Sequence, residues 1–406
     1  MAELQFAAQS YQSRAAQLLA QECINAFVET APKDAKTQVP IFGTPGLSFC
    51  IRGGKGPING MWIMAGNLYF LSGGALYETL ASSLVINADG SAFATSTLIG
   101  QTDLGGVVSM ADNGLQLVMV SRGGWIYQPG GLNLVTTATV GIGATSIPAN
   151  ITGVITTGDT LNIPLDSGAI FTTTASSATG PLDGVIELTD ALIDQVSAGA
   201  VVIDPTNVLG QISAPAYMEA DAVTYMDGYF VFNAAGTRQF FLSGINDGTQ
   251  YSGLDFATAT ANTGFVLAVV NFHEQLLIFT SKPSTEVWYD SGAIAFPFQR
   301  YDGVYIQRGI AGPLAQCSED NTVFWMGDDG IMYRLNGFVP QRISTFAMEH
   351  VWAQYPLRFL DAQMFVLDQE GHKFVIVQFP SGCGTWCYDI STQLWHQRQS
   401  CGTPWV

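Results

Sequence analysis

Basic residues are scarce in this sequence, and their scarcity limits what the protein can bind. Lysines and arginines number 15 against 33 aspartates and glutamates, which gives a formal net charge of −18 at pH 7. The stretch from Gly123 to Thr237 contains no lysine or arginine. A protein that neutralises nucleic-acid phosphates needs clustered basic side chains. The composition therefore argues against sequence-specific binding of nucleic acid.

Charged residues of either sign are few, and long apolar runs are absent. Charged side chains make up 12% of the chain, whereas about 25% is usual in globular proteins. Much of the surface is therefore expected to be buried, in the core or against other subunits. A membrane-spanning helix needs about 18 consecutive apolar residues, and the segment from Leu84 to Ile99 is interrupted by Asn87 and Asp89. Stable membrane insertion is not predicted.

The N-terminus lacks a secretory signal, and the cysteines lack a disulfide pattern. Residues Met1 to Phe6 contain neither a basic leader nor a continuous apolar core, so synthesis in the cytoplasm is expected. The spacing of the cysteines demands no disulfide framework, and we expect buried thiols. The six cysteines are Cys23, Cys50, Cys317, Cys383, Cys387 and Cys401.

The sequence does contain an internal repeat. Each copy has a short apolar run, a turn of Gly, Asp, Asn or Ser, and a second run that carries an aromatic residue. Nearly every position of these runs is apolar, as in strands that are covered on both faces. The runs are short and rich in β-branched or aromatic residues, which disfavours helices. The copies begin at Met61, Leu115, Tyr229, Gln275, Val323 and Lys373.

The spacing of the copies predicts an all-β protein with a β-propeller fold. The interval is 46 residues from Tyr229 to Gln275 and again from Gln275 to Asn321, which lies just before the fifth copy. It is 52 residues from Asn321 to Lys373 and 54 from Met61 to Leu115. A four-stranded propeller blade takes about 40–50 residues. The interval of 114 residues from Leu115 to Tyr229 is too long, but removing about 70 residues restores the period. We therefore predict six or seven blades and a small inserted β domain.

Four parts of the chain are predicted from this pattern. Residues 1–50 form an N-terminal arm with a short helix between Gln9 and Phe27 and an irregular segment. Residues 51–131 and 208–406 form the blades, and residues 132–207 form the inserted domain. Within the insert, a short helix is expected at 190–196. Its strands are expected at 140–147, 160–163, 169–174, 185–188 and 200–203.

Several acidic residues have the chemistry required of a glycoside-cleaving pair. Asp328 and Asp329, together with Asp302 and Asp320, are candidates for the acid and the nucleophile. However, Asp328 and Asp329 precede a glycine in an expected hairpin turn, where Asp is favoured for backbone reasons. The segment from Ser381 to Trp386 resembles an Asp-box turn but lacks the aspartate, and a structural turn is preferred.

Two cysteines and two histidines suggest a zinc site, but only weakly. Cys383 and Cys387 have a permissible spacing and lie near His372 and His396. One cysteine is expected in a turn and the other in a strand, which disfavours a shared metal. No partner is evident for two further histidines, His273 and His350.

No catalytic set, cofactor site or metal site is therefore predicted. Nucleophile-elbow and phosphate-binding glycine motifs are absent. The tryptophans recur with the blade period and are interpreted as packing between blades instead of a sugar-binding surface. They are Trp62, Trp125, Trp288, Trp325, Trp386 and Trp395.

The order of several short motifs resembles a known family. The motifs are Gln21 to Glu29, Ala31 to Lys33, Phe42 to Leu47, Gly66 to Tyr69, Asp227 to Phe230, Thr285 to Tyr289, Gly309 to Gly312 and Trp325 to Gly327. In this order they look like the packaged-DNA-stabilising, or tail hub, proteins of short-tailed phages. The resemblance covers most of the chain outside the insert.

The resemblance implies a non-enzymatic component of the virion tail. Members of the family form a hexamer below the portal and adaptor rings after DNA packaging, close the exit channel, and carry a tail needle or plug and the spikes or fibres. They usually continue beyond the point where this chain ends, so either a seventh blade is missing or the N-terminal segment closes the ring. The first alternative is a carbohydrate-binding or glycoside-cleaving propeller that acts as a phage receptor-binding protein. The second is a general scaffold for protein interactions.

Overall fold

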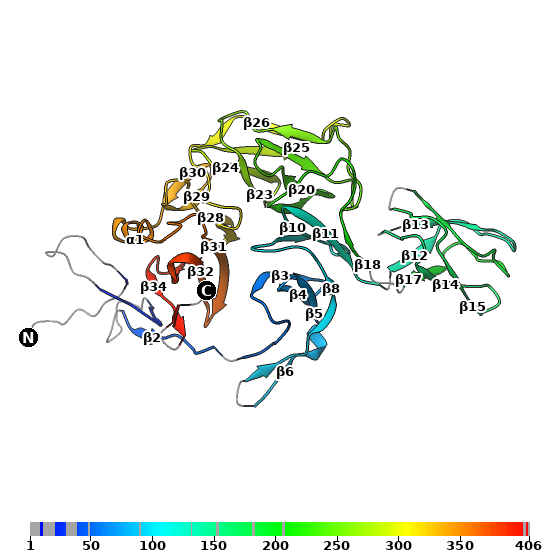
Figure 1. Ribbon diagram of the computed structural model, residues 1–406, viewed down its shortest axis with the longest axis horizontal. Helices are drawn as coiled ribbons and strands as arrows, with labels where there is room; N and C mark the ends of the chain where they lie inside the picture. The colour runs from blue at the N-terminus through cyan, green and yellow to red at the C-terminus, as the bar shows by residue number, and fades with distance from the viewer. Residues whose placement is uncertain are drawn as a thin grey trace, which may run out of the picture.

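The chain forms a β-propeller with a separate barrel inserted into its second blade. The computed structural model describes residues 9–10, 21–29, 39–47, 49–88, 91–130, 132–151, 154–180, 183–204, 208–400 and 403–404. Within these residues six four-stranded antiparallel sheets follow one another along an arc (Figure 1). Each sheet is one blade, and the predicted all-β propeller is confirmed.

The first three blades contain the N-terminal half of the propeller. Blade 1 consists of β3 (Ile58–Met64), β4 (Asn67–Ser72), β5 (Ala75–Thr79) and β8 (Thr97–Gln101). Blade 2 consists of β9 (Ser109–Asp112), β10 (Leu117–Ser121), β11 (Gly123–Gln128) and β18 (Val208–Gln211). Blade 3 consists of β19 (Val223–Met226), β20 (Tyr229–Asn233), β21 (Gln239–Leu242) and β22 (Phe256–Thr258).

The last three blades complete the arc. Blade 4 consists of β23 (Val266–Phe272), β24 (Gln275–Thr280), β25 (Thr285–Asp290) and β26 (Phe298–Ile306). Blade 5 consists of β27 (Gln316–Glu319), β28 (Thr322–Met326), β29 (Met332–Asn336) and β30 (Val339–Arg342). Blade 6 consists of β31 (Gln363–Gln369), β32 (His372–Phe379), β33 (Gly384–Asp389) and β34 (Trp395–Gln397).

The repeat identified in the sequence corresponds to the middle two strands of a blade, with one exception. In blades 2 to 6 the two apolar runs are the second and third strands, which are buried on both faces. In blade 1 the predicted copy that begins at Met61 covers β3 and β4, the first and second strands. That assignment is wrong by one strand because β3 is as apolar as a middle strand, although much of it is exposed.

Apolar cores fill the junctions between successive blades. Clusters of buried side chains join blades 1 and 2, 2 and 3, 3 and 4, 4 and 5, and 5 and 6. The third and sixth copies illustrate the pattern, since Phe232 and Val375 are fully buried members of these clusters. Among the described residues no such cluster joins blade 6 to blade 1.

The interval between β11 and β18 forms a small six-stranded barrel. Its strands are β12 (Leu132–Thr136), β13 (Ser146–Asn150), β14 (Thr160–Pro164), β15 (Ile170–Thr174), β16 (Val185–Glu187) and β17 (Val201–Asp204). The sheet order is β15-β14-β17-β12-β13-β16. A bridge between Ala175 and Leu188 and a hydrogen bond from the Ser176 amide to the Glu187 carbonyl join the two outer strands. The barrel therefore closes around an apolar core of its own.

Two predictions within the insert are wrong. Residues 190–196 do not form a helix, because their backbone bonds to other segments: the Leu192 amide donates to Ala144, and Val196 pairs with Val140. The first strand begins at Ser146 instead of residue 140, because residues 141–143 form a turn in which Gly143 has φ +83°. The strand β12 was not predicted.

The N-terminal arm lies against blade 6 and continues to blade 1. Strand β1 (Ala26–Val28) pairs with β2 (Ile41–Gly43). Most of the predicted helix lies outside the described residues, and its expected end at Phe27 is wrong because that residue belongs to β1. Backbone pairing explains this difference, since the Gln397 amide donates to the Cys23 carbonyl and Phe27 pairs with Phe42.

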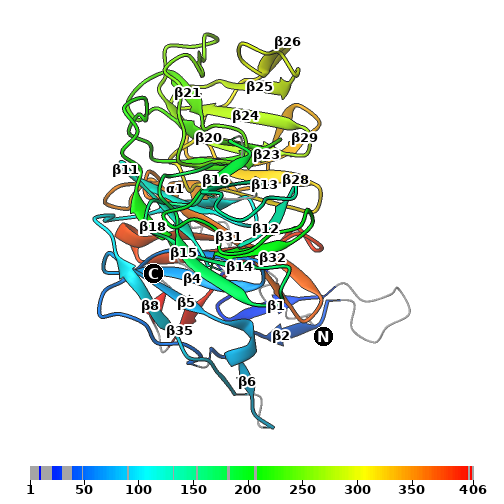
Figure 2. The ribbon, with the colours of Figure 1, turned by 90° about the vertical axis from the view of Figure 1, so that its right-hand side faces the viewer.

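The remaining elements are short. They are β6 (Val85–Ile86), β7 (Ala92–Phe93), β35 (Gln399–Ser400), β36 (Thr403–Pro404), the 3-10 turns η1 (Ala81–Ser83) and η2 (Pro380–Gly382), and the helix α1 (Phe346–Trp352). Hairpin β6–β7 projects from the propeller body in both views (Figures 1 and 2). Among the described residues no helix is long and apolar enough to span a bilayer.

Candidate functional site

The face of blade 1 that points away from blade 2 is an apolar sheet surface. Directly paired residues of antiparallel strands project to the same face. Met61 pairs with Phe70, Phe70 with Tyr77, and Tyr77 with Leu98, so these four side chains form one row across the blade. Met61 is 64% exposed, and Ile63, which lies on the same face, is 67% exposed.

The opposite face of blade 1 is covered by blade 2. Gly60 lies against Val108 and Met110, and the Trp62 Nε1–H donates to Asp112 at 2.6 Å. The contrast shows why the apolar residues of β3 differ in burial: alternate residues face blade 2, while the others have no neighbouring blade on their side. Apolar surface left in this way is usually a site of interaction.

The matching face of blade 6 is partly covered by the N-terminal arm. Phe27 packs against Phe374, Ile376 and Cys387. The arm is held there by backbone bonds and by Asn25, whose side chain bonds the backbone of Gln399 in both directions. Phe365, on the innermost strand of the same blade, remains 40% exposed.

The segment that links the arm to β3 lies on the apolar face of blade 1. A Cβ atom on Gly53 would come within 2.4 Å of the Phe70 ring, so only glycine allows the segment to lie this close. The Arg52 guanidinium lies over the Phe49 ring, 5.5 Å from its centroid. We call Arg52, Lys55, Met61, Ile63 and Leu98 the open face.

A buried polar group supports blade 6 beneath the N-terminal arm. Arg398 is fully buried; its Nε donates to His396 Nε2 at 3.1 Å, and its Nη1 donates to Gln369 at 2.7 Å. Its guanidinium also lies over the Phe374 ring. Burial and the nearby Arg398 charge lower the pKa of His396 to about 3. His396 is therefore neutral at pH 7 and acts as a hydrogen-bond acceptor.

The end of the barrel farthest from its connection to the propeller carries exposed isoleucines. Ile142, Ile170 and Ile193 are 72%, 69% and 66% exposed. Their turns are joined: the Gly143 amide donates to the Leu192 carbonyl, and the Asp166 amide donates to the Gln195 carbonyl. We call Ile142, Ile170, Ile193, Asp166 and Asp194 the barrel tip.

Both carboxylates of the barrel tip are held by local hydrogen bonds. Asp166 accepts from the Ser197 hydroxyl and the Gln195 amide, and these bonds lower its pKa. Hydrogen bonds also lower the pKa of Asp194, mainly one to Ser167. Both groups are therefore negatively charged at pH 7.

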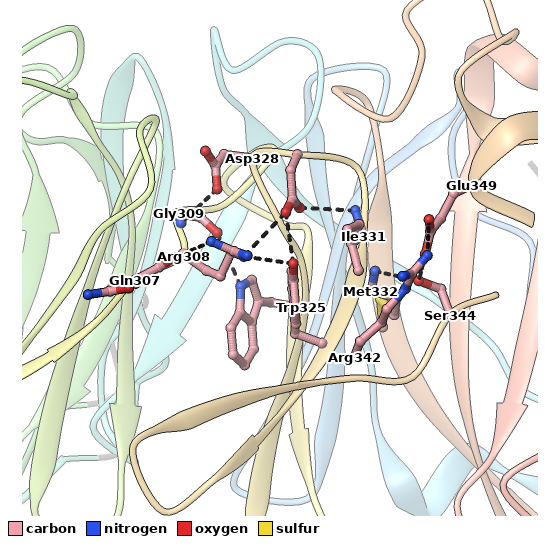
Figure 3. Close-up of polar contacts among 12 residues, drawn as sticks. Gln307, Arg308, Gly309, Trp325, Asp328, Ile331, Met332, Arg342, Ser344 and Glu349 are labelled. Atoms are coloured by element: carbon pink, nitrogen blue, oxygen red, sulfur yellow. Dashed lines mark hydrogen bonds and ion pairs between the residues drawn. The ribbon is translucent and has the colours of Figure 1, made fainter. Parts of the chain in front are cut away.

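The first pair of predicted catalytic acids, Asp328 and Asp329, stabilises the junction between blades 4 and 5. Asp328 accepts from the Gly309 amide at 2.9 Å (Figure 3). Asp329 accepts from the Tyr333 hydroxyl at 2.7 Å and pairs with Arg308 at 3.3 Å. These bonds give both carboxylates a structural role in the turn between β28 and β29.

The other two predicted acids lie elsewhere. Asp320 is in the turn at the opposite end of β28 and pairs with Arg334 at 2.8 Å. The five residues of β28 extend over roughly 16 Å, whereas glycosidase carboxylates lie about 5–9.5 Å apart. Asp302 is exposed in β26, the outer strand of blade 4. The structure does not bring these acids together as a catalytic pair.

The residues of the zinc hypothesis also have separate partners. Cys387 is buried, which raises the pKa of its thiol to about 12, whereas Cys383 is exposed at the end of η2. His372 Nδ1 lies 2.8 Å from Asp389, and His396 bonds Arg398. Among the described residues no group of three or more His, Cys, Asp or Glu side chains is arranged to hold a metal.

The turn that resembles an Asp-box is shaped by packing. A Cβ atom on Gly382 or Gly384 would come within 2.4 Å of the Tyr355 side chain, which lies over both glycines. Cys383 between them has φ +48°. Of the two remaining histidines, His273 is exposed, while His350 lies 2.8 Å from Gln354.

Each of the six repeat tryptophans donates its indole N–H to a partner in the fold. Trp62 bonds Asp112, Trp125 bonds Asp103, Trp288 bonds Glu286, Trp325 bonds the Gly309 carbonyl, Trp386 bonds Tyr355 and Trp395 bonds the Ile343 carbonyl. Most of these bonds connect one blade to the next blade or to the segment between them. The tryptophans therefore have the role expected of packing residues.

The blade junctions also contain the motifs that carry the family resemblance. In one, the Ala311 amide donates to the Met326 carbonyl, and a Cβ atom on Gly309 would come within 2.3 Å of Thr280 and Lys282 carbonyls. In another, the buried Glu286 accepts from the amides of Thr260 and Ala261 at 2.7 and 2.6 Å. These residues position one blade against the next.

A comparison with protein families identifies the group to which this fold belongs. The family described as Bacteriophage P22 Gp10, beta-propeller matches residues 187–401, more than half of the chain. The chain belongs to this phage-stabilisation family. The match covers the end of the barrel and all of blades 3 to 6. The protein is thus a structural β-propeller of a phage, as the resemblance implied.

Comparisons with other proteins give weaker similarities. No curated protein matches the sequence. Among solved structures, the Phage phi92 endosialidase is 10% identical with a TM-score of 0.43, covering 92% of this chain and 62% of that one. The computationally designed Ika8 protein is 12% identical with a TM-score of 0.39, covering 87% of this chain and 91% of that one.

Sequence reasoning missed the open face and the barrel tip. One signal for the tip was available: Ile142 stands between two glycines and Ile170 follows a Ser-Gly-Ala turn, where a buried apolar residue is not expected. The open face had no comparable signal, because Met61 and Ile63 read as part of an ordinary buried strand.

Proposed function

We propose that this phage structural β-propeller is a subunit of the tail hub. Copies of the chain, six in number, assemble below the portal and adaptor rings after DNA packaging. There they close the exit channel, retain the genome and anchor the tail needle or plug and the spikes or fibres. The observation that carries the proposal is the family match across blades 3 to 6. In this role the protein belongs to the virion tail and takes part in head-to-tail connection and genome ejection.

The charge of the chain supports a channel wall that does not bind DNA. The formal net charge is −18, and several of the few basic side chains are neutralised within the fold. Arg122, Arg300, Arg308, Arg334, Arg342 and Lys373 each pair with a carboxylate. An acidic surface repels DNA, so the genome is retained by closing its exit and passes without adhering during ejection.

The exposed apolar surfaces support permanent contacts with other subunits. The open face and the barrel tip both present large apolar side chains to solvent. Surfaces of this kind are typical of lasting interfaces. We infer that the protein acts through assembly and not through catalysis, since each of its candidate catalytic acids has a structural partner or lies alone.

The test is to produce particles of the parent phage without this protein. We expect them to package DNA and then lose it, and to retain the packaged DNA when the purified chain is added before it escapes. Cryo-electron microscopy of complete particles should show a six-fold ring of propellers below the adaptor. Particles that keep their DNA but fail to bind host cells would instead support the receptor-binding alternative.

A further inference from the structure

The barrel tip combines apolar side chains with negative charge. Its three isoleucines are among the most exposed apolar residues of the chain, and Asp166 and Asp194 lie in the same joined turns. The whole insert, residues 132–207, contains seven acidic residues and no lysine, arginine or histidine. A surface that binds this tip therefore needs an apolar patch with positive charge beside it.

The open face has the complementary character. Met61, Ile63 and Leu98 provide the apolar area, and the segment that crosses blade 1 adds Arg52 and Lys55, both exposed. Neither cation forms an ion pair with a carboxylate of the described residues, unlike most other basic side chains of the propeller. Positive charge beside apolar surface is thus available on a chain that is otherwise strongly acidic.

We infer that the barrel tip of one copy docks on the open face of a second copy. Apolar side chains then cover Met61 and Ile63, and Asp166 and Asp194 approach Arg52 and Lys55. The inference rests on the self-assembly proposed above and names the two surfaces that produce it. Complementary charge of this kind fixes the orientation of the contact and raises its rate of formation.

The position of the barrel requires the two surfaces to belong to different copies. The barrel extends outward from blade 2, on the side of the propeller opposite the N-terminal arm (Figure 1). Its tip points away from the propeller and so cannot reach the open face of its own chain. A contact between two different surfaces is head-to-tail, and it produces a closed ring when the rotation between copies closes.

Two variants of the full-length chain test the inference. The tip variant combines Ile142→Asp with Ile193→Asp, and the face variant combines Arg52→Glu with Lys55→Glu. All four positions are exposed, so folding should be unaffected, which circular dichroism and the melting temperature check. Ile294→Asp, at a fully exposed residue between β25 and β26, is the control for adding charge to an apolar surface residue.

Sedimentation velocity across the micromolar range gives the readout. We expect the unmodified chain and the Ile294→Asp control to self-associate, and each variant alone to associate at least tenfold more weakly. An equal mixture of the two variants should form pairs that do not grow further. Each pair has only one intact tip and one intact face, and both are used in the contact between its two members. That result is specific to a head-to-tail contact.

Three other outcomes overturn the inference in distinguishable ways. If the unmodified chain stays monomeric, both the proposed self-assembly and the tip-to-face contact are wrong. If both variants associate as strongly as the unmodified chain, self-assembly stands and the named surfaces are wrong. If each variant is impaired but their mixture forms no pairs, the contact is not between the tip and the open face.

Discussion

The buried histidine of blade 6 should make the protein sensitive to mild acid. His396 has a folded pKa of about 3, below the value of about 6.5 that it has in an unfolded chain. Between these values the unfolded chain binds a proton that the folded chain excludes. The stabilisation of the fold by neutral His396 is therefore complete above about pH 6.5. As the pH falls below this value, the free energy of unfolding decreases by up to about 1.4 kcal/mol per pH unit.

The expected effect at about pH 5 is a loss of roughly 2 kcal/mol of unfolding free energy, since this pH lies about 1.5 units below the unfolded pKa. The perturbation is His396→Gln, because the glutamine carbonyl still accepts the hydrogen bond of Arg398 but does not titrate. Urea unfolding measured between about pH 7 and pH 5 should show a smaller loss of stability for the variant than for the unmodified chain.

The comparison uses the slope of the unfolding free energy with pH and not its absolute value, because the substitution also removes the contact of the imidazole with Phe374. His273→Asn serves as the control, since His273 is exposed and asparagine tolerates its φ of +57°. Asp389 does not confuse the result, because its pKa is lowered and it titrates below this range. Equal slopes for the variant and the unmodified chain would refute the reasoning.

Three further predictions concern the blade junctions and the barrel. Gly309→Ala should destabilise the protein by several kcal/mol, because the new Cβ atom would lie 2.3 Å or less from the carbonyls of Thr280 and Lys282. The control is Gly210→Ala, whose Cβ atom would have nothing within 4 Å. This control should be nearly neutral in thermal unfolding. Glu286→Ala should lower the free energy of unfolding by about 2–4 kcal/mol, because it removes the acceptor of two backbone amides and the Trp288 indole. A loss below about 1 kcal/mol in urea unfolding would show that water takes the place of the carboxylate as acceptor. Replacing residues 132–204 by a short turn should leave the propeller folded, because Gln128 and Val208, the residues flanking the insert, are paired; circular dichroism and sedimentation should show a stable chain that no longer self-associates.

The blades were predictable because their signal is local. Strand β28 is buried at every position, and its sequence is apolar at nearly every position as well. A turn containing Gly330 then joins it to β29. Such a hairpin can be recognised from about a dozen consecutive residues, without knowledge of what lies on either side. The same signal misplaced the first copy, because a strand's apolar sequence does not reveal its place within a blade.

Short elements were not predictable for a related reason. Helix α1 has only seven residues, from Phe346 to Trp352, so it contains less than two full turns of periodic pattern. Its N-cap, Thr345, accepts from the Met348 amide, but Thr345 also reads as part of a turn. The expected helix at 190–196 had a comparable pattern, and there pairing with Val140 and Ala144 prevailed.

The open face could not be predicted because burial of a sheet depends on residues far away in sequence. Met61 is exposed since no blade lies against that side of β3, and the last blade of the arc, which contains Phe365, follows about 300 residues later in the sequence. The acidic pair at the barrel tip has the same origin, because Asp166 and Asp194 are brought together by backbone and side-chain bonds between turns that are distant in the sequence.

The family match covers the blade junctions of the second half of the propeller but only part of the surfaces proposed for self-contact. Residues 187–401, which match the family, include blades 3 to 6 and their junction motifs. The open face and four complete strands of the barrel lie before residue 187, outside the match. The family membership therefore explains how blades 3 to 6 are held together. The open face and most of the barrel tip lie outside the match, whereas Ile193 and Asp194 of the tip lie within it. Exchanging the barrel for the segment that joins the corresponding strands in a relative should then alter assembly while the blades remain folded.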